Sequence, residues 1–161
     1  NYLQLDVPYE GQTTVLHYLE VLRDRIGWDA VAAKVKNPLK DKKIGAYYGC
    51  LLLRPSREMQ FDDPENPTIL EDFIRAIGAE PVYYGMRNEC CGGYTTIENR
   101  AYASKQAQKI ADSAKAQGAE LLITACPLCL YNLSQNTDGT LPVRYFTELL
   151  AEALGVGEDA E

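Results

Sequence analysis

The chain has 161 residues, of which 46% are hydrophobic and 24% charged, and its formal net charge is -7. This length can bury a full core without disulfide support, and the acidic balance disfavours a nucleic acid or an anionic membrane as the main partner. No apolar run approaches the ~20 residues that span a bilayer, so we expect no membrane span and a cytoplasmic location.

The first predicted element is an amphipathic helix over residues 13–25, in which Val15, Leu19 and Leu22 recur at helical spacing before Gly27 ends it. A second, short helix is predicted over residues 28–35. We expect residues 1–40 to be an N-terminal helical segment. The only histidine, His17, lies off the apolar helix face, and we interpret it as a surface or packing residue.

Four short apolar runs predict strands at residues 44–48, 81–84, 121–124 and 143–145. The intervening segments have helical signals. Asn66 and Pro67 predict the start of a helix that ends at Gly78, and Thr95 and Glu98 have capping-box spacing for a helix to about residue 117. Pro127 predicts a first helical position, which makes Cys126 the N-cap of a helix to about residue 134. A last helix is predicted near residues 146–154.

Strands that alternate with helices predict an α/β fold. We expect an open, mostly parallel sheet of about four strands with helices on both faces, preceded by the N-terminal helical segment. Residues 41–155 are assigned to this domain and residues 156–161 to a frayed tail. Because parallel strands share one carboxyl edge, where open α/β sheets bind ligands, residues that follow different strands converge there.

The five cysteines all follow predicted strands. Cys50 comes after the first strand, the vicinal pair Cys90 and Cys91 after the second, and Cys126 and Cys129 form a C-x-x-C motif after the third. An odd number fits poorly with a closed disulfide set, and clustered thiols in a reducing compartment indicate metal or redox chemistry. Several converging thiolates repel one another, so a cationic centre of iron or zinc is needed, and helix N-termini favour the thiolate form.

The residues leave four interpretations of these cysteines. Single free cysteines often pack as small core hydrophobes. A zinc site would use four sulfurs and leave one over. A dithiol redox pair at Cys126 and Cys129 would leave the other three unexplained. An iron-sulfur cluster takes thiolates from several loops, and a fifth thiolate is either a reserve ligand for a cubane or a sign of a cluster of unusual shape.

Several motifs carry a resemblance to a known family over most of the chain. They are Tyr47-Tyr48-Gly49-Cys50, Arg54-Pro55, Cys90-Cys91-Gly92-Gly93, and Cys126-Pro127-Leu128-Cys129 followed by Asn132-Leu133. With them the chain resembles the cysteine-rich CCG domain found in the B subunit of heterodisulfide reductase, specifically the C-terminal half of that subunit. The resemblance implies that residues 1–40 are a linker from a missing N-terminal half. The resemblance implies a non-cubane 4Fe-4S cluster held by Cys50, Cys90, Cys91, Cys126 and Cys129.

The same resemblance implies a reductase of the CoB-CoM heterodisulfide type, with iron-sulfur and flavin subunits as partners and a disulfide as substrate. In that family, two CCG domains in one polypeptide hold a disulfide between their clusters and reduce it to two thiols, one electron at a time. Only one CCG motif is present here, so the isolated chain is expected to be incomplete. An aerobic preparation is expected to lack the cluster or to hold zinc in its place.

Three arginines, Arg54, Arg57 and Arg87, lie near the predicted strand ends. We interpret them as solvated surface residues. The alternative is that they offset the charge of a cluster or steer an anionic substrate.

Overall fold

Four short parallel strands form the centre of the protein, for which a computed structural model describes residues 10–156. The strands are β1 (Lys43–Tyr47), β2 (Glu80–Val82), β3 (Leu121–Thr124) and β4 (Val143–Tyr145), in the spatial order β2-β1-β3-β4. Every pairing is parallel, with Tyr47 beside Thr124 where β1 and β3 end. The predicted open parallel sheet is therefore confirmed.

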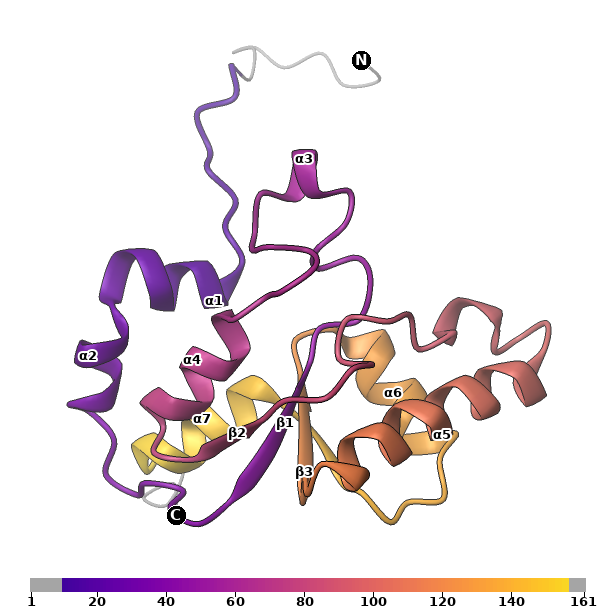
Figure 1. Cartoon of the computed structure of the whole chain (residues 1–161). Coiled ribbons are helices and arrows are strands. Elements are labelled where there is room, and N and C mark those ends of the chain that lie inside the picture. Colours follow the sequence, from indigo (N-terminus) through magenta and orange to yellow (C-terminus); the bar gives the residue numbers. More distant parts are fainter. Residues whose placement is uncertain (1–9, 157–161) are drawn as a thin grey trace.

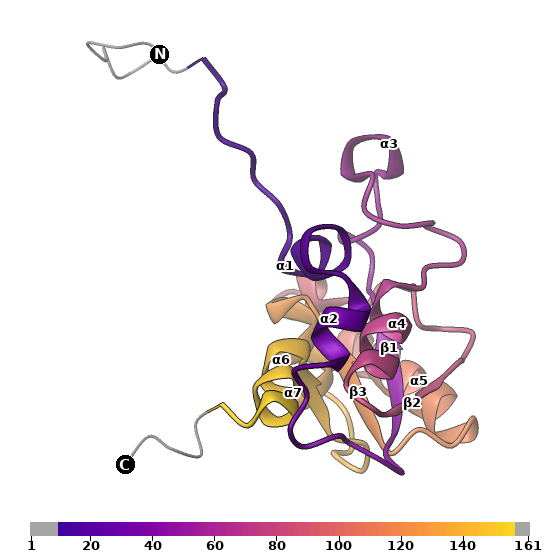
Figure 2. The same ribbon diagram turned by 90° about the vertical axis from the view of Figure 1, so that its left-hand side faces the viewer.

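Helices cover both faces of the sheet, as predicted (Figure 1). One face carries α1 (Tyr18–Glu20) with the π-helical turn η1 (Val21–Ile26), α2 (Trp28–Ala32), α4 (Ile69–Ala76) and α7 (Phe146–Leu154). The other face carries α5 (Arg100–Ala116) and α6 (Pro127–Gln135). Two short elements, α3 (Ser56–Met59) and η2 (Gly93–Thr95), lie in the connections that follow β1 and β2. Figure 2 shows α3 and the extended stretch before α1 at the same end of the molecule.

Side-chain alternation along the strands divides the core into two layers. Ile44 and Ile123 pack with α4 and α7, whereas Tyr47 and Leu122 pack with α5. On the α5 side the contact is close, because Ala103, Ala107 and Ala114 of that helix are fully buried. A methyl group at Gly45 would lie 2.7 Å from Leu122 Cδ2, so this strand position has no room for a side chain.

The N-terminal helix begins at Tyr18 and not near residue 13, so that part of the prediction is wrong. The cause is that His17 caps the helix in a reciprocal pair with Glu20. His17 Nδ1 accepts from the Leu19 amide at 3.1 Å, and the Glu20 carboxylate accepts from the His17 amide at 2.7 Å. Val15 lies outside the helix and is 89% exposed. His17 is a packing residue, as predicted, with its ring edge-on to Phe61 at 5.1 Å.

Two further helix starts differ from the prediction because their caps come from other residues. Before α4, Asp62 Oδ2 accepts from the amides of Thr68 and Ile69, each at 2.8 Å, so Asn66 is not the cap. Before α5, the Thr95 hydroxyl donates to the Gly92 carbonyl, and the helix begins at Arg100 with Asn99 as its N-cap. The predicted capping box at residues 95 and 98 is therefore wrong.

The N-terminal helices belong to the same core as the sheet. Leu19, Leu22 and Val31 are buried with residues of α4 and α7. The domain bounds at residues 41 and 155, and the linker role of residues 1–40, stay predictions. The predicted frayed tail falls mostly on residues 157–161, outside the described residues. Within residues 10–156, no helix is both long and apolar enough to cross a membrane.

Candidate functional site

The strand order places a crevice at the carboxyl ends of β1 and β3. The connection after β1 leads to β2 at one edge of the sheet, and the connection after β3 leads to β4 at the opposite edge. The loops that follow the neighbouring strands β1 and β3 therefore diverge from each other. Such a switch point is where open α/β sheets bind ligands. Cys50 follows β1 and Cys126 follows β3, and the loop after β2 brings Cys90 and Cys91 to the same edge.

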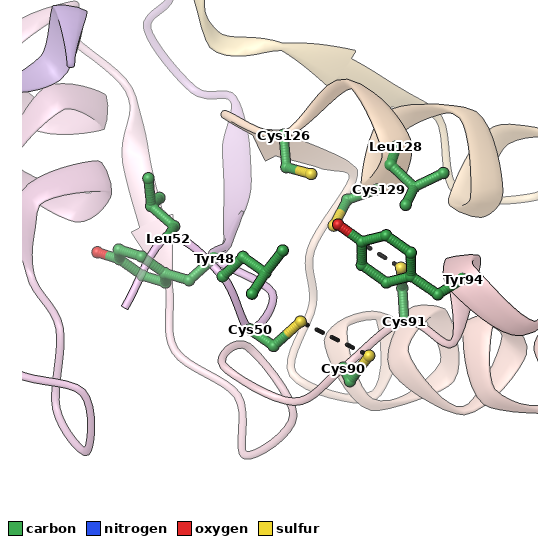
Figure 3. Close-up of a pocket in the computed structure, with 10 residues that line it drawn as sticks. Tyr48, Cys50, Leu52, Cys90, Cys91, Tyr94, Cys126, Leu128 and Cys129 are labelled. Carbon is green, nitrogen blue, oxygen red and sulfur yellow. Dashed lines mark hydrogen bonds between the residues drawn. The ribbon is translucent and has the colours of Figure 1, made fainter. Parts of the chain in front are cut away.

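All five cysteines line one pocket at this edge (Figure 3). All five are free thiols, and four of them form two close pairs: Cys50 Sγ lies 3.7 Å from Cys90 Sγ, and Cys91 Sγ lies 3.7 Å from Cys129 Sγ. Cys91 and Cys129 are buried, Cys50 and Cys126 are half-buried, and Cys90 is exposed. The structure thus brings together every cysteine that the sequence singled out.

The rest of the pocket wall is apolar or aromatic, which the sequence analysis did not predict. The additional lining residues are Tyr48, Leu51, Leu52, Tyr94 and Leu128. Their only sequence signal is that each lies within three positions of a cysteine. At the buried Cys91 and Cys129, apolar surroundings exclude water and strengthen the electrostatic interactions of the sulfur atoms.

Backbone amide groups after the vicinal pair point at the thiols. The Gly92 amide donates to Cys90 Sγ at 3.4 Å and the Gly93 amide to Cys91 Sγ at 3.3 Å. Gly92 has φ +77°, a left-handed conformation that favours glycine and produces this turn. The two glycines therefore allow adjacent thiols to receive amide hydrogen bonds on the same short loop.

The predicted cap at the start of α6 is confirmed, with Cys126 at the N-cap and Pro127 in the first turn. A hydrogen bond from Cys129 lowers the pKa of the Cys126 thiol to about 6. The same donor, with the Gly93 amide, lowers the pKa of Cys91 to about 6. Cys129 holds its proton between these two sulfurs, which raises its own pKa. Burial, and then the neighbouring Cys90, raise the pKa of Cys50.

Arg87 is not the surface residue that we predicted. It is 8% exposed and forms an ion pair with Glu71, which is fully buried, and its Nη2 donates to Asn66 Oδ1 at 2.6 Å. Arg54 is half-buried and donates to the carbonyls of Asn88 and Pro64, each at 3.0 Å. Of the three arginines, Arg57 alone is an exposed residue, on α3.

The donor set fits a group with several cysteine ligands. Five thiols surround a single pocket, two of them have lowered pKa values, and amide groups and a helix N-terminus stabilise negative sulfur. Within residues 10–156, no three His, Cys, Asp or Glu side chains are grouped tightly enough to hold a single metal ion. The thiols come from three loops and line one pocket, and a polynuclear iron-sulfur group takes thiolates from several loops.

The profile of the CCG cysteine-rich domain matches residues 44–134, which include all five cysteines and the first three strands. The chain belongs to the CCG cysteine-rich domain family. The resemblance identified from the cysteine motifs is thereby confirmed.

Relatives that the chain matches include subunits of reductases. The chain is 30% identical to the 8-methylmenaquinol:fumarate reductase membrane anchor subunit of Wolinella succinogenes, over 94% of this chain and 56% of that protein. It is 27% identical to the B subunit of the ferredoxin:CoB-CoM heterodisulfide reductase of Methanosarcina mazei, over 97% of this chain and 55% of that protein. A protein of Archaeoglobus profundus that is itself like the heterodisulfide reductase B subunit is 27% identical over 91% of this chain and 54% of its own length. The chain therefore spans about half the length of these relatives.

Proposed function

We propose that the chain is an iron-sulfur redox module of a protein like the B subunit of heterodisulfide reductase, which passes electrons to a disulfide. The observation that carries this proposal is the convergence of all five cysteines on one pocket at the switch point of the sheet. Membership of the CCG family and similarity to reductase subunits support the same chemistry. A cytoplasmic location is part of the proposal.

Cys50, Cys90, Cys91, Cys126 and Cys129 would hold the cluster. One thiolate more than the four of a cubane is available, which supports the non-cubane 4Fe-4S type. When bound, the cluster supplies a store for single electrons next to the substrate. The Gly92 and Gly93 amides would stabilise negative charge on the sulfurs of Cys90 and Cys91.

The reaction at this site would be the reduction of a disulfide to two thiols. The sulfur-sulfur bond breaks, and each sulfur gains one electron and one proton. The two electrons come from iron-sulfur and flavin subunits of a reductase complex, and the protons come from solvent. The apolar side chains of Leu51, Leu52 and Leu128 would keep other water away from the sulfurs during the transfer. A substrate of the CoB-CoM heterodisulfide type is proposed by analogy with the Methanosarcina mazei relative.

Anaerobic reconstitution of the full chain with iron and sulfide tests the proposal. We expect about four irons and four sulfides per chain, with visible charge-transfer absorption. Cys50→Ser should lose or alter this absorption, whereas Arg57→Gln, an exposed change on α3, should leave it intact. One zinc per chain without sulfide would contradict the proposal and support a structural zinc site instead.

A second candidate function is a dithiol oxidoreductase, which one observation favours. Cys126 occupies the N-cap of α6 with a thiol pKa of about 6 and is hydrogen-bonded to Cys129. A pair at a helix N-terminus is typical of C-x-x-C redox enzymes. In that case Cys50→Ser and Cys91→Ser would keep disulfide-reducing activity, whereas Cys126→Ser would abolish it. Under the first proposal all three variants lose the activity.

A further inference from the structure

We propose that Asn132 is a positioning residue that sets the reduction potential of the iron-sulfur site through its buried hydrogen bond to the backbone of Cys91. This inference rests on the proposed function and adds to it a residue outside the cysteine ligands. Asn132 lies on α6, one turn after Cys129, on the side of the helix that faces the core layer shared with α5.

The Asn132 amide is buried directly behind Cys91. Its side chain is fully shielded from solvent, and Nδ2 donates to the backbone carbonyl of Cys91 at 2.7 Å. A single buried amide thus anchors the main chain of Cys91, whose sulfur lines the pocket.

A chain of hydrogen bonds fixes which end of this amide faces Cys91. Asn132 Oδ1 accepts from the Thr96 hydroxyl at 3.1 Å and from Asn136 Nδ2 at 2.7 Å. Asn136 Oδ1 in turn accepts from Arg100 Nε at 3.1 Å. Because two donors already occupy the Asn132 oxygen, a flip of the amide would place donor against donor, so the nitrogen is held toward Cys91.

A buried N–H donor at a cluster ligand has a defined effect on the redox equilibrium. Its partial positive charge lies beside the ligand residue, which stabilises the reduced and more negative state and raises the reduction potential. The effect is strong here because the low dielectric of the core screens it weakly. Burying this amide also carries a desolvation cost, which a leucine at the same helix position would avoid.

Two substitutions separate this role from simple packing. Asn132→Asp keeps the oxygen that accepts from Thr96 and Asn136 but removes the N–H donor, and Asn132→Leu removes the donor and acceptor together. The matched control is Asn136→Leu, because Asn136 is also a buried asparagine of this network, 7% exposed, and its side chain hydrogen-bonds Asn132 and Arg100 rather than Cys91.

The measurement is the reduction potential of each full chain, reconstituted anaerobically and titrated with monitoring by electron paramagnetic resonance. Both Asn132 variants should have a lower potential than the parent, by about tenfold in the reduced-to-oxidised ratio, or ~59 mV for a one-electron couple. The Asp variant should shift further because it adds a negative charge. Asn136→Leu should keep the parent potential, because Thr96 still donates to the Asn132 oxygen and holds the amide nitrogen toward Cys91. Circular dichroism should show that each variant is folded.

The outcomes distinguish this inference from the proposed function. A parent chain that assembles no iron-sulfur cluster overturns the proposed function and this inference with it. A parent that assembles the cluster, with Asn132 variants of unchanged potential, overturns this inference alone. An equal shift in Asn136→Leu, or loss of the cluster in both Asn132 variants, would also overturn it, because the role of Asn132 would then be packing.

Discussion

At the scale of single residues, a buried carboxylate joins two of the loops that carry cysteines. Glu71, on α4, accepts from the Tyr48 hydroxyl and forms an ion pair with Arg87. The Tyr48 amide donates to the Arg87 carbonyl at 2.8 Å. Tyr48 precedes Cys50 by two residues and Arg87 precedes Cys90 by three, so this network fixes the distance between the loops that follow β1 and β2.

Removal of Arg87 should therefore destabilise the protein strongly. Arg87→Met leaves the fully buried Glu71 carboxylate without its cation, which costs about 3–5 kcal/mol of unfolding free energy. Arg75→Met is the matched control, because Arg75 pairs with Asp72 at 2.7 Å on the exposed side of α4, where an ion pair is worth at most ~1 kcal/mol. Urea denaturation of both variants measures the difference. Equal losses would contradict a special role for the buried pair.

At the scale of helices and strands, the sequence predicted those elements whose boundaries are determined by interactions between neighbouring residues. The strands were found from short apolar runs, and the start of α6 from Pro127 after Cys126. The start of α4 was missed because its cap, Asp62, lies six residues before Thr68 and reaches it through a loop. The start of α5 was missed because Thr95 bonds back to Gly92, inside the turn that shapes the cysteine loop.

The capping of α1 by His17 makes the N-terminal segment sensitive to pH. Burial lowers the pKa of His17 below 6.5, although the Glu20 charge partly opposes this. The folded state thus binds fewer protons than the unfolded chain, and stability that is present above pH 6.5 is lost as the pH falls through the lowered pKa. Protonation also removes the Nδ1 acceptor that caps Leu19.

We therefore expect the unfolding free energy to fall between pH 7.5 and pH 5.5 by more in the parent chain than in His17→Asn. Asparagine keeps an N-cap acceptor but does not titrate in this range. Urea denaturation at several pH values measures both slopes, and the difference between them isolates His17 from the carboxylates that titrate in both chains. Parallel slopes would show that the histidine has no part in the pH dependence.

At the scale of the whole molecule, parallel topology explains why the cysteines could be predicted to meet. Any parallel sheet gathers the residues that follow its strands at one edge, so their convergence needed no knowledge of the strand order. The surroundings of the cysteines could not be predicted in the same way. From the sequence, Glu71 is an ordinary acidic residue of a first helical turn and Arg87 is a surface cation. Their contact in the structure explains why both are buried.

The adjacency of β1 and β3 leads to a final prediction. It brings the loop after β1 against α6, where a methyl group at Gly49 would lie 3.0 Å from Cys129 Sγ. Gly49 has φ +69°, so Gly49→Ala should cost the ~1–2 kcal/mol of a left-handed alanine and also displace that sulfur. Gly139→Ala is the matched control, with φ +73° and no atom within 4 Å of the added methyl.

Both alanine variants should lose similar stability from backbone strain, but only Gly49→Ala should lose iron and sulfide on anaerobic reconstitution. The reason is that the added methyl group crowds a sulfur on a neighbouring element, and a shift of that sulfur changes the pocket that all five cysteines share. Iron and sulfide analysis beside urea denaturation gives both quantities. Full iron content in Gly49→Ala would mean that the position of Cys129 Sγ is not set by the approach of β1 to α6.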